Sequence, residues 1–172
     1  MAVPLQKFRE VVFQMLYSYD ISHATDENML DLLTKELSVT RKTVRDAQER
    51  VHQIRQKLDQ IDEMITKTSH AYAFERIQSV ERNVLRLGIF ELFFDETIPP
   101  KVAISEAMRL ARKFGTKESA IFVNAILDAL YKSSLGENID EKQLKHSFEE
   151  LDKSEQIAKE ASQQPQEPEK NH

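Results

Sequence analysis

The sequence of 172 residues contains no cysteine, only three glycines and five prolines, and no long apolar run. Without cysteine the chain can form no disulfide, thiolate metal site or cysteine nucleophile, which is typical of proteins in a reducing cytosol. No stretch approaches the roughly 18 apolar residues that a membrane span needs, and the N-terminus lacks a signal-peptide pattern. We therefore expect a soluble, cytoplasmic protein.

The scarcity of glycine and proline also bears on the fold class. Strand-rich folds need many turn residues, so a chain with so few predicts helices joined by short connections. Hydrophobic residues make up 40% of the chain and charged residues 31%. This composition and length are typical of one globular domain with a real core.

The net charge of −5 is unevenly distributed. Residues 137–172 hold ten acidic residues and five lysines, whereas residues 1–136 carry the remaining 19 acidic and 19 basic residues. We therefore divide the chain into a helical domain at 1–136 and an acidic, partly disordered tail at 137–172. The acidic balance belongs to the tail and leaves room for a basic surface on the domain.

Hydrophobic periodicity predicts the helices of the first half. Apolar residues recur at helical spacing over 4–20, and a second helix is expected after a cap at Thr25 or Asp26. Residues 40–68 carry sparse apolar positions at heptad-like spacing, which predicts one long helix with a narrow buried seam.

The second half is more apolar. Residues 76–95 leave little polar face, which predicts a central helix whose Gly88 lets another helix approach closely. A helix from about 99 to 114 is expected to stop at Gly115, and Thr116 can cap another through about Ser134. Beyond these, we expect a marginal helix near 140–160 and disorder from 163 to 172.

The sequence offers no support for catalysis. Glu49 and His52 have the Glu-x-x-His spacing of di-iron bundle proteins, but such a site needs a second copy, which the sequence lacks. There is also no glycine-rich phosphate loop, zinc-binding His-Glu-x-x-His or nucleophile elbow. We expect neither an enzyme nor a bound cofactor or metal.

Three surface features are open to two interpretations each. Phe13 and Tyr17 stand one turn apart opposite the apolar stripe of the first helix, so they either form a docking surface or are covered by another helix or the tail. Phe122 lies at the edge of its apolar stripe beside Lys113 and Lys117, either as a stacking platform for an unpaired base or as core. Residues 41–57 hold six basic and two acidic residues, either as a second basic surface or as a solvated face.

Several segments carry a resemblance to a known family. They are RE at 9–10, QMLYS at 14–18, VERNVLRLGIFEL at 80–92, IPPKVAISEA at 98–107, LARKFG at 110–115 and FVNAILD at 122–128. In order and spacing they resemble the NusB family of transcription antitermination factors over most of residues 5–133. The resemblance implies an all-α fold of about seven helices in two packed subdomains, here followed by a polar acidic extension.

The resemblance also implies function. Members of this family bind single-stranded boxA RNA in nascent ribosomal transcripts together with the ribosomal protein NusE, and load onto RNA polymerase with other Nus factors. They occur as monomers or homodimers.

The family's functional positions can be placed in this sequence. The implied RNA-binding residues are Lys7, Arg9, Lys113, Lys117, Glu118 and Phe122. Tyr17 and Glu81 fall where the protein partner docks, next to Phe13 of the aromatic pair. Many relatives have an arginine cluster before the Arg-Glu pair, where this chain has LQKF at 5–8. Fewer phosphate contacts weaken binding, so we expect this chain to need its partner to bind RNA well.

Two other functions are weighed against this one. NusB-like domains also begin ribosomal RNA cytosine methyltransferases, but those need an α/β domain and catalytic cysteines, which these 172 residues do not contain. A helical adaptor that binds only proteins stays open, because the helical domain is neutral. The acidic tail is either inert or competes with RNA for the basic surface.

Overall fold

The structure is a computed structural model that describes residues 3–22, 26–69 and 72–163, and every regular element within these ranges is helical. The helices are α1 (Leu5–Ser22), α2 (Asp26–Glu36), α3 (Arg41–Gln56), α4 (Leu58–Thr68), α5 (Ser79–Phe93), α6 (Pro100–Phe114), α7 (Lys117–Ser134) and α8 (Glu141–Gln163), with a short 3-10 turn η1 (Phe74–Arg76). The expected cap at Thr25 lies outside the described residues. Of the residues expected to be disordered, 163–172, Gln163 is the last residue of α8 and the others lie outside the described residues.

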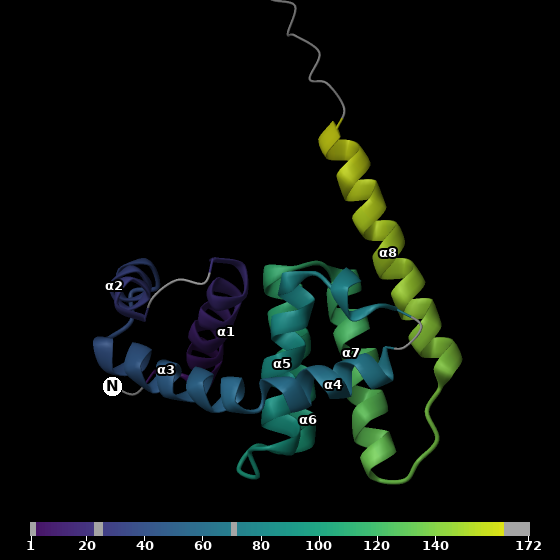
Figure 1. Cartoon of the computed structure of the whole chain (residues 1–172), viewed down its shortest axis with the longest axis horizontal. Coiled ribbons are helices and arrows are strands. Elements are labelled where there is room, and N and C mark those ends of the chain that lie inside the picture. The colour runs from purple at the N-terminus through teal and green to yellow at the C-terminus, as the bar shows by residue number, and fades with distance from the viewer. Residues whose placement is uncertain (1–2, 23–25, 70–71, 164–172) are drawn as a thin grey trace, which may run out of the picture.

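The helices form two packed groups, as Figure 1 shows. At one end α1 packs against α3, and α2 also lies against α3. At the other end α6 and α7 pack against each other and against α5, while α4 contacts both α5 and α7. Helix α5 joins the groups because it also packs against α1. The expected all-helical architecture is confirmed.

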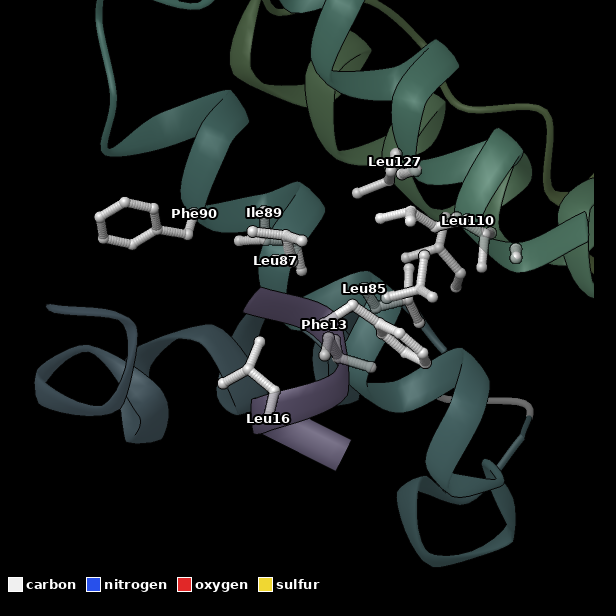
Figure 2. Close-up of a cluster of buried hydrophobic side chains, with 14 of the residues drawn as sticks. Phe13, Leu16, Leu85, Leu87, Ile89, Phe90, Leu110 and Leu127 are labelled. Atoms are coloured by element: carbon white, nitrogen blue, oxygen red, sulfur yellow. The ribbon is translucent and has the colours of Figure 1, made fainter. Parts of the chain in front are cut away.

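Helix α5 is the centre of the core, as its sequence predicts. Ten of its residues are buried, and its apolar side chains meet those of α1, α6 and α7 in the cluster drawn in Figure 2. A Cβ on Gly88 would lie 3.0 Å from Leu127 Cδ1 and 3.2 Å from Ala107 Cβ. Glycine therefore allows α6 and α7 to approach the backbone of α5 closely.

The long helix expected over residues 40–68 is two helices. Lys57 leaves the helical conformation at φ −104° and ψ 6°, and its N–H donates to Ile54 O at 3.0 Å, one residue short of the α-helical partner. The break lets the apolar seam change neighbours: α3 packs against α1 and α2, whereas α4 packs against α5 and α7. Spacing alone could not reveal this change of direction.

The junction between α6 and α7 follows the expected local rules. Pro100 occupies the first turn of α6, and Thr116 caps α7 by accepting from Ser119 N at 3.1 Å, while Ser119 Oγ accepts from Thr116 N. At Gly115 a Cβ would meet Ser119 Oγ at 2.7 Å and Ala111 O at 2.8 Å, so the tight turn admits only glycine.

The first part of the acidic extension is a packed helix. Helix α8 runs for 23 residues and lies against α7, with Leu144, Phe148 and Leu151 buried at helical spacing. It extends slightly beyond the marginal helix expected near 140–160, and these three side chains anchor its first half to the body. No described helix is both long and apolar enough to cross a membrane.

Candidate nucleic-acid interface

Basic side chains from α1 and α6 meet around one carboxylate. Glu10 accepts hydrogen bonds from Arg109 at 2.8 Å and from Lys113 at 3.0 Å, and Lys7 Nζ lies 3.9 Å from Glu10 Oε2. Burial alone would raise the pKa of Glu10, but the hydrogen bonds from Arg109 and Lys113 hold it below its ordinary value. The fold therefore brings Lys7 and Lys113 together, although about a hundred residues separate them in the sequence.

The lysines of this cluster remain accessible. About half of the Lys113 side chain and 39% of the Lys7 side chain are exposed to solvent. Lys117 is exposed at the start of α7, two residues after Gly115, and Glu118 beside it is half-buried. We call Lys7, Lys113 and Lys117 the lysine surface; it offers ammonium groups that suit phosphate oxygens.

Arg9, in contrast, lies inside the protein. Only 6% of the residue is exposed, and its Nε donates to both carboxylate oxygens of Glu91, at 2.8 Å and 3.1 Å. Its Nη1 also lies 3.6 Å from Glu106 Oε2. Burial raises the pKa of Glu91, against the lowering effect of Arg9. In this arrangement Arg9 ties α1 to α5 and α6, and its guanidinium is turned to the carboxylates of Glu91 and Glu106.

Phe122 is buried as well. Its ring is fully buried, 6.1 Å from the ring of Tyr72 and 5.2 Å from that of Phe148 on α8. Of its two interpretations the structure therefore supports the core, because α8 covers this side of α7. The ring is part of the core here and presents no face to a base.

The aromatic pair of α1 is only partly outward. Phe13 is 2% exposed and packs against Phe114 at 4.7 Å, so the interpretation that another helix covers it is correct. The helical-wheel argument assumed one buried face, whereas α1 is covered from several sides. Tyr17, 6.0 Å from Phe13, is half-buried and lines a groove with Arg82, Asp152, Glu155 and Lys159.

Glu81 is a buried carboxylate that is only half satisfied. Its Oε1 accepts from Ser119 Oγ at 2.5 Å, while Oε2 is buried and has no hydrogen-bond partner within the described residues. Glu155 of α8 also has a buried carboxylate oxygen, Oε1, without a hydrogen-bond partner within the described residues. Burial, and then the charge of Glu81, raise the pKa of Glu155.

Three of the six basic residues in the second basic stretch, at 41–57, form ion pairs with neighbouring carboxylates. Arg41 and Lys42 pair with Asp31 and Asp46 at 3.0 Å and 2.9 Å, and Arg50 pairs with Asp95 at 2.7 Å. The guanidinium of Arg55 stacks 4.6 Å over the ring of Tyr19. Glu49 and His52 are exposed on the same helix, where His52 Nε2 contacts Gln56 at 3.2 Å.

Sequence reasoning missed a second polar network. Asp20 at the end of α1 accepts hydrogen bonds from Arg82 and Asn83, and Arg86 bonds both oxygens of Asp62 at 2.9 Å. It joins α1, α4 and α5. Apart from the polar residues on the otherwise apolar α5, nothing in the sequence indicated that they were paired.

The chain matches known proteins over most of its length. The model of the NusB family matches residues 6–132, which end before α8 begins. The transcription antitermination protein NusB of Chlamydia pneumoniae is 36% identical over 136 residues, covering 78% of this chain and 85% of that protein. The NusB of Myxococcus xanthus is 39% identical over 124 residues, or 70% and 89% of the two chains.

Solved structures give the same answer. NusB of Thermotoga maritima superposes with a TM-score of 0.66 at 31% identity, covering 84% of this chain and 99% of that one. A second match is a chain in a crystal structure of the antitermination factors NusB and NusE in complex with double-stranded RNA. It superposes with a TM-score of 0.66 at 26% identity. That match covers 75% of this chain and 96% of the other.

Proposed function

Because this chain belongs to the NusB family, we propose that it is a transcription antitermination factor that binds RNA together with a NusE protein. The relatives named for this function are 36% and 39% identical to it over the aligned residues, and in one solved structure NusB occurs with NusE and RNA. The proposed role is binding in the cytoplasm, without catalysis. We further propose single-stranded boxA RNA as the ligand, and RNA polymerase with other Nus factors as the assembly that the complex joins.

The observation that carries the RNA-binding proposal is the convergence of Lys7 and Lys113 on Glu10. A single carboxylate holds the two ammonium groups close together while leaving both side chains partly exposed. Lys117 extends the lysine surface to the start of α7. Ammonium groups bind phosphate oxygens without regard to sequence, so these residues would position the RNA backbone.

The other predicted residues fall into two groups. Arg9 and Phe13 are buried, and we assign them the support of Lys7 and Tyr17 on α1. Tyr17 and the half-satisfied Glu81 are the proposed contacts for NusE. Glu118 lies beside Lys117 and would limit how closely a phosphate approaches there. Phe122 could meet RNA only if α8 were displaced.

Gel shifts test the proposal directly. We expect the chain to shift boxA RNA weakly alone and strongly with NusE, and to prefer the single strand to its duplex. The double substitution Lys7→Ala/Lys113→Ala should weaken the ternary complex about tenfold and lower its salt dependence by roughly 0.7 in log–log slope for each phosphate that is no longer neutralised. Lys101→Ala is the matched control, because Lys101 is exposed at the opposite end of α6.

A protein-only adaptor is the second candidate. It is favoured by two carboxylates that neutralise part of the basic cluster. The same experiment separates the two functions: NusE binding with no RNA shift in any mixture supports the adaptor. A shift that is equal for the double variant and the control would show that the lysine surface is wrongly assigned.

A further inference from the structure

Helix α8 has two unequal halves. The first half is anchored in the core, because Leu144, Phe148 and Leu151 are buried and Phe148 packs against both Tyr72 and Phe122. The second half, Asp152–Gln163, has no buried residue, and its Ile157 is 67% exposed. In Figure 1 the end of α8 extends past the ends of the neighbouring helices. An ion pair from Asp152 to Arg76 at 2.6 Å links the start of this half to η1.

This distal half lies against the two residues proposed to contact NusE. Tyr17 lines one groove and Glu81 lines another, and α8 contributes Glu155 and Lys159 to both. The second groove also reaches Gly115 and Thr116 at the junction that leads into the lysine surface. The distal half of α8 therefore lines both grooves, and a protein docking on Tyr17 and Glu81 would meet it.

The contact between α8 and this surface is electrostatically poor. Glu81 Oε2 and Glu155 Oε1 are both buried without a hydrogen-bond partner among the described residues, and the two carboxylates repel each other. A buried carboxylate oxygen without a donor is costly. A partner that offers Glu81 a cationic or N–H group would satisfy an acceptor that α8 leaves empty.

We propose that the distal half of α8 is a built-in competitor for the NusE-binding surface and moves away when NusE docks. The proposal rests on the proposed function, since it assigns Tyr17 and Glu81 to that partner. The anchored first half would stay in place, and the chain would yield after Leu151. The apparent affinity for NusE is then reduced by the fraction of molecules in which the distal half is docked.

Two substitutions with opposite expected effects test this in the full chain. Gln156→Pro breaks the helix at an exposed position and frees the distal half without removing any packing side chain. We expect it to lower the Kd for the NusE encoded in the same genome about fivefold. Gln156→Ala, which keeps the helix, is its matched control and should leave the Kd unchanged.

The second substitution tightens the contact. Glu155→Gln removes the like charge and supplies an amide N–H that can donate a hydrogen bond to Glu81 Oε2. The distal half of α8 would then dock more tightly, so the Kd for NusE should rise about threefold. Glu160→Gln removes the same charge from an exposed position on the same helix and should have no effect. The thermal unfolding midpoint of each variant verifies that the core is retained, whereas the helical signal in circular dichroism should fall only for Gln156→Pro.

The outcomes distinguish failure of the α8 competitor from failure of the proposed function. Equal NusE affinity for Gln156→Pro and Gln156→Ala would overturn the competitor while leaving the proposed function intact, and so would equal affinity for Glu155→Gln and Glu160→Gln. An effect confined to RNA binding without NusE would overturn it as well, because the competition would then concern RNA. If NusE binds none of the proteins, the proposed function fails and the competitor fails with it.

Discussion

Two buried carboxylates of α5 differ in the hydrogen-bond donors that they receive. Glu91 in the middle of α5 receives both of its hydrogen bonds from the buried Arg9 of α1. Glu81, ten residues earlier on the same helix, keeps one oxygen without a donor and is repelled by the half-buried carboxylate of Glu155 on α8. Removing one member of a buried pair such as Arg9–Glu91 is costly, whereas the carboxylate of Glu81 already lacks one hydrogen-bond donor within the described residues.

The largest expected effect comes from breaking the satisfied pair. Arg9→Met leaves Glu91 buried without its cation, which should lower the free energy of unfolding by about 3–5 kcal/mol in urea denaturation. Arg9→Met/Glu91→Leu removes both charges at similar volume and should recover most of that loss. A single variant that loses under about 1 kcal/mol would show that Arg9 is not structural and would return it to the RNA-binding set.

An intermediate effect is expected at Asp20, whose hydrogen bonds from Arg82 and Asn83 tie α1 to α5. Asp20→Ala should cost about 2 kcal/mol of unfolding free energy, because charged hydrogen bonds are removed and Arg82 stays partly buried. Burial alone would raise the pKa of Asp20, but the hydrogen bond from Arg82 holds it below the ordinary 3.8.

The same pKa sets a pH dependence. A carboxyl whose pKa is lowered by folding stabilises the protein above its ordinary value, and this contribution is lost as the pH falls through the folded pKa. The difference in stability between the parent and Asp20→Ala should therefore be constant above about pH 4 and shrink below it. Urea titrations at several pH values measure this, and a difference that is independent of pH would contradict the assignment.

Features that depend on neighbouring residues could be predicted from the sequence, whereas features that depend on distant segments could not. The capping of α7 by Thr116, the stop at Gly115 and the close packing at Gly88 were predictable because each follows from a few adjacent residues. The burial of Phe13 and Phe122 was not, since a helical wheel describes one face while Phe114 and Phe148 cover these rings from distant segments. Arg9 looked like a free cation because Glu91 lies 82 residues away.

The same reasoning applies to the proposed site. The family resemblance assigned Lys7, Lys113 and Glu81 to RNA and partner contacts, which stay predictions, but it did not indicate Glu10 and Arg109, which the structure shows beside the lysines. It also stopped short of α8, which lies beyond the part of the chain that the family model matches. The packing of α8 was thus the part of the fold that the resemblance could least predict.

The smallest expected effect is the response of α8 to pH, which tests the contrast between Glu91 and Glu81 most directly. Glu155 faces charged groups from every side of its contact: Glu81 on α5, Arg76 on η1, and Asp152 and Lys159 on α8. Burial and then Glu81 raise its pKa above the ordinary 4.5. An acid whose pKa is raised by folding stabilises the docked state when protonated, so this contribution is present below pH 4.5 and is lost as the pH rises through the raised value.

The distal half of α8 should therefore bind the body more tightly as the pH falls from neutral toward 4.5, before Asp20 begins to protonate. Carbon-detected NMR of the Glu155 carboxyl measures the pKa, and the amide shifts of Asp152–Gln163 report docking over the same range. In Glu155→Gln the pH dependence of those amides should disappear. If Glu155 instead titrates at or below 4.5, the two carboxylates do not oppose each other, and the contrast between Glu91 and Glu81 loses its physical basis.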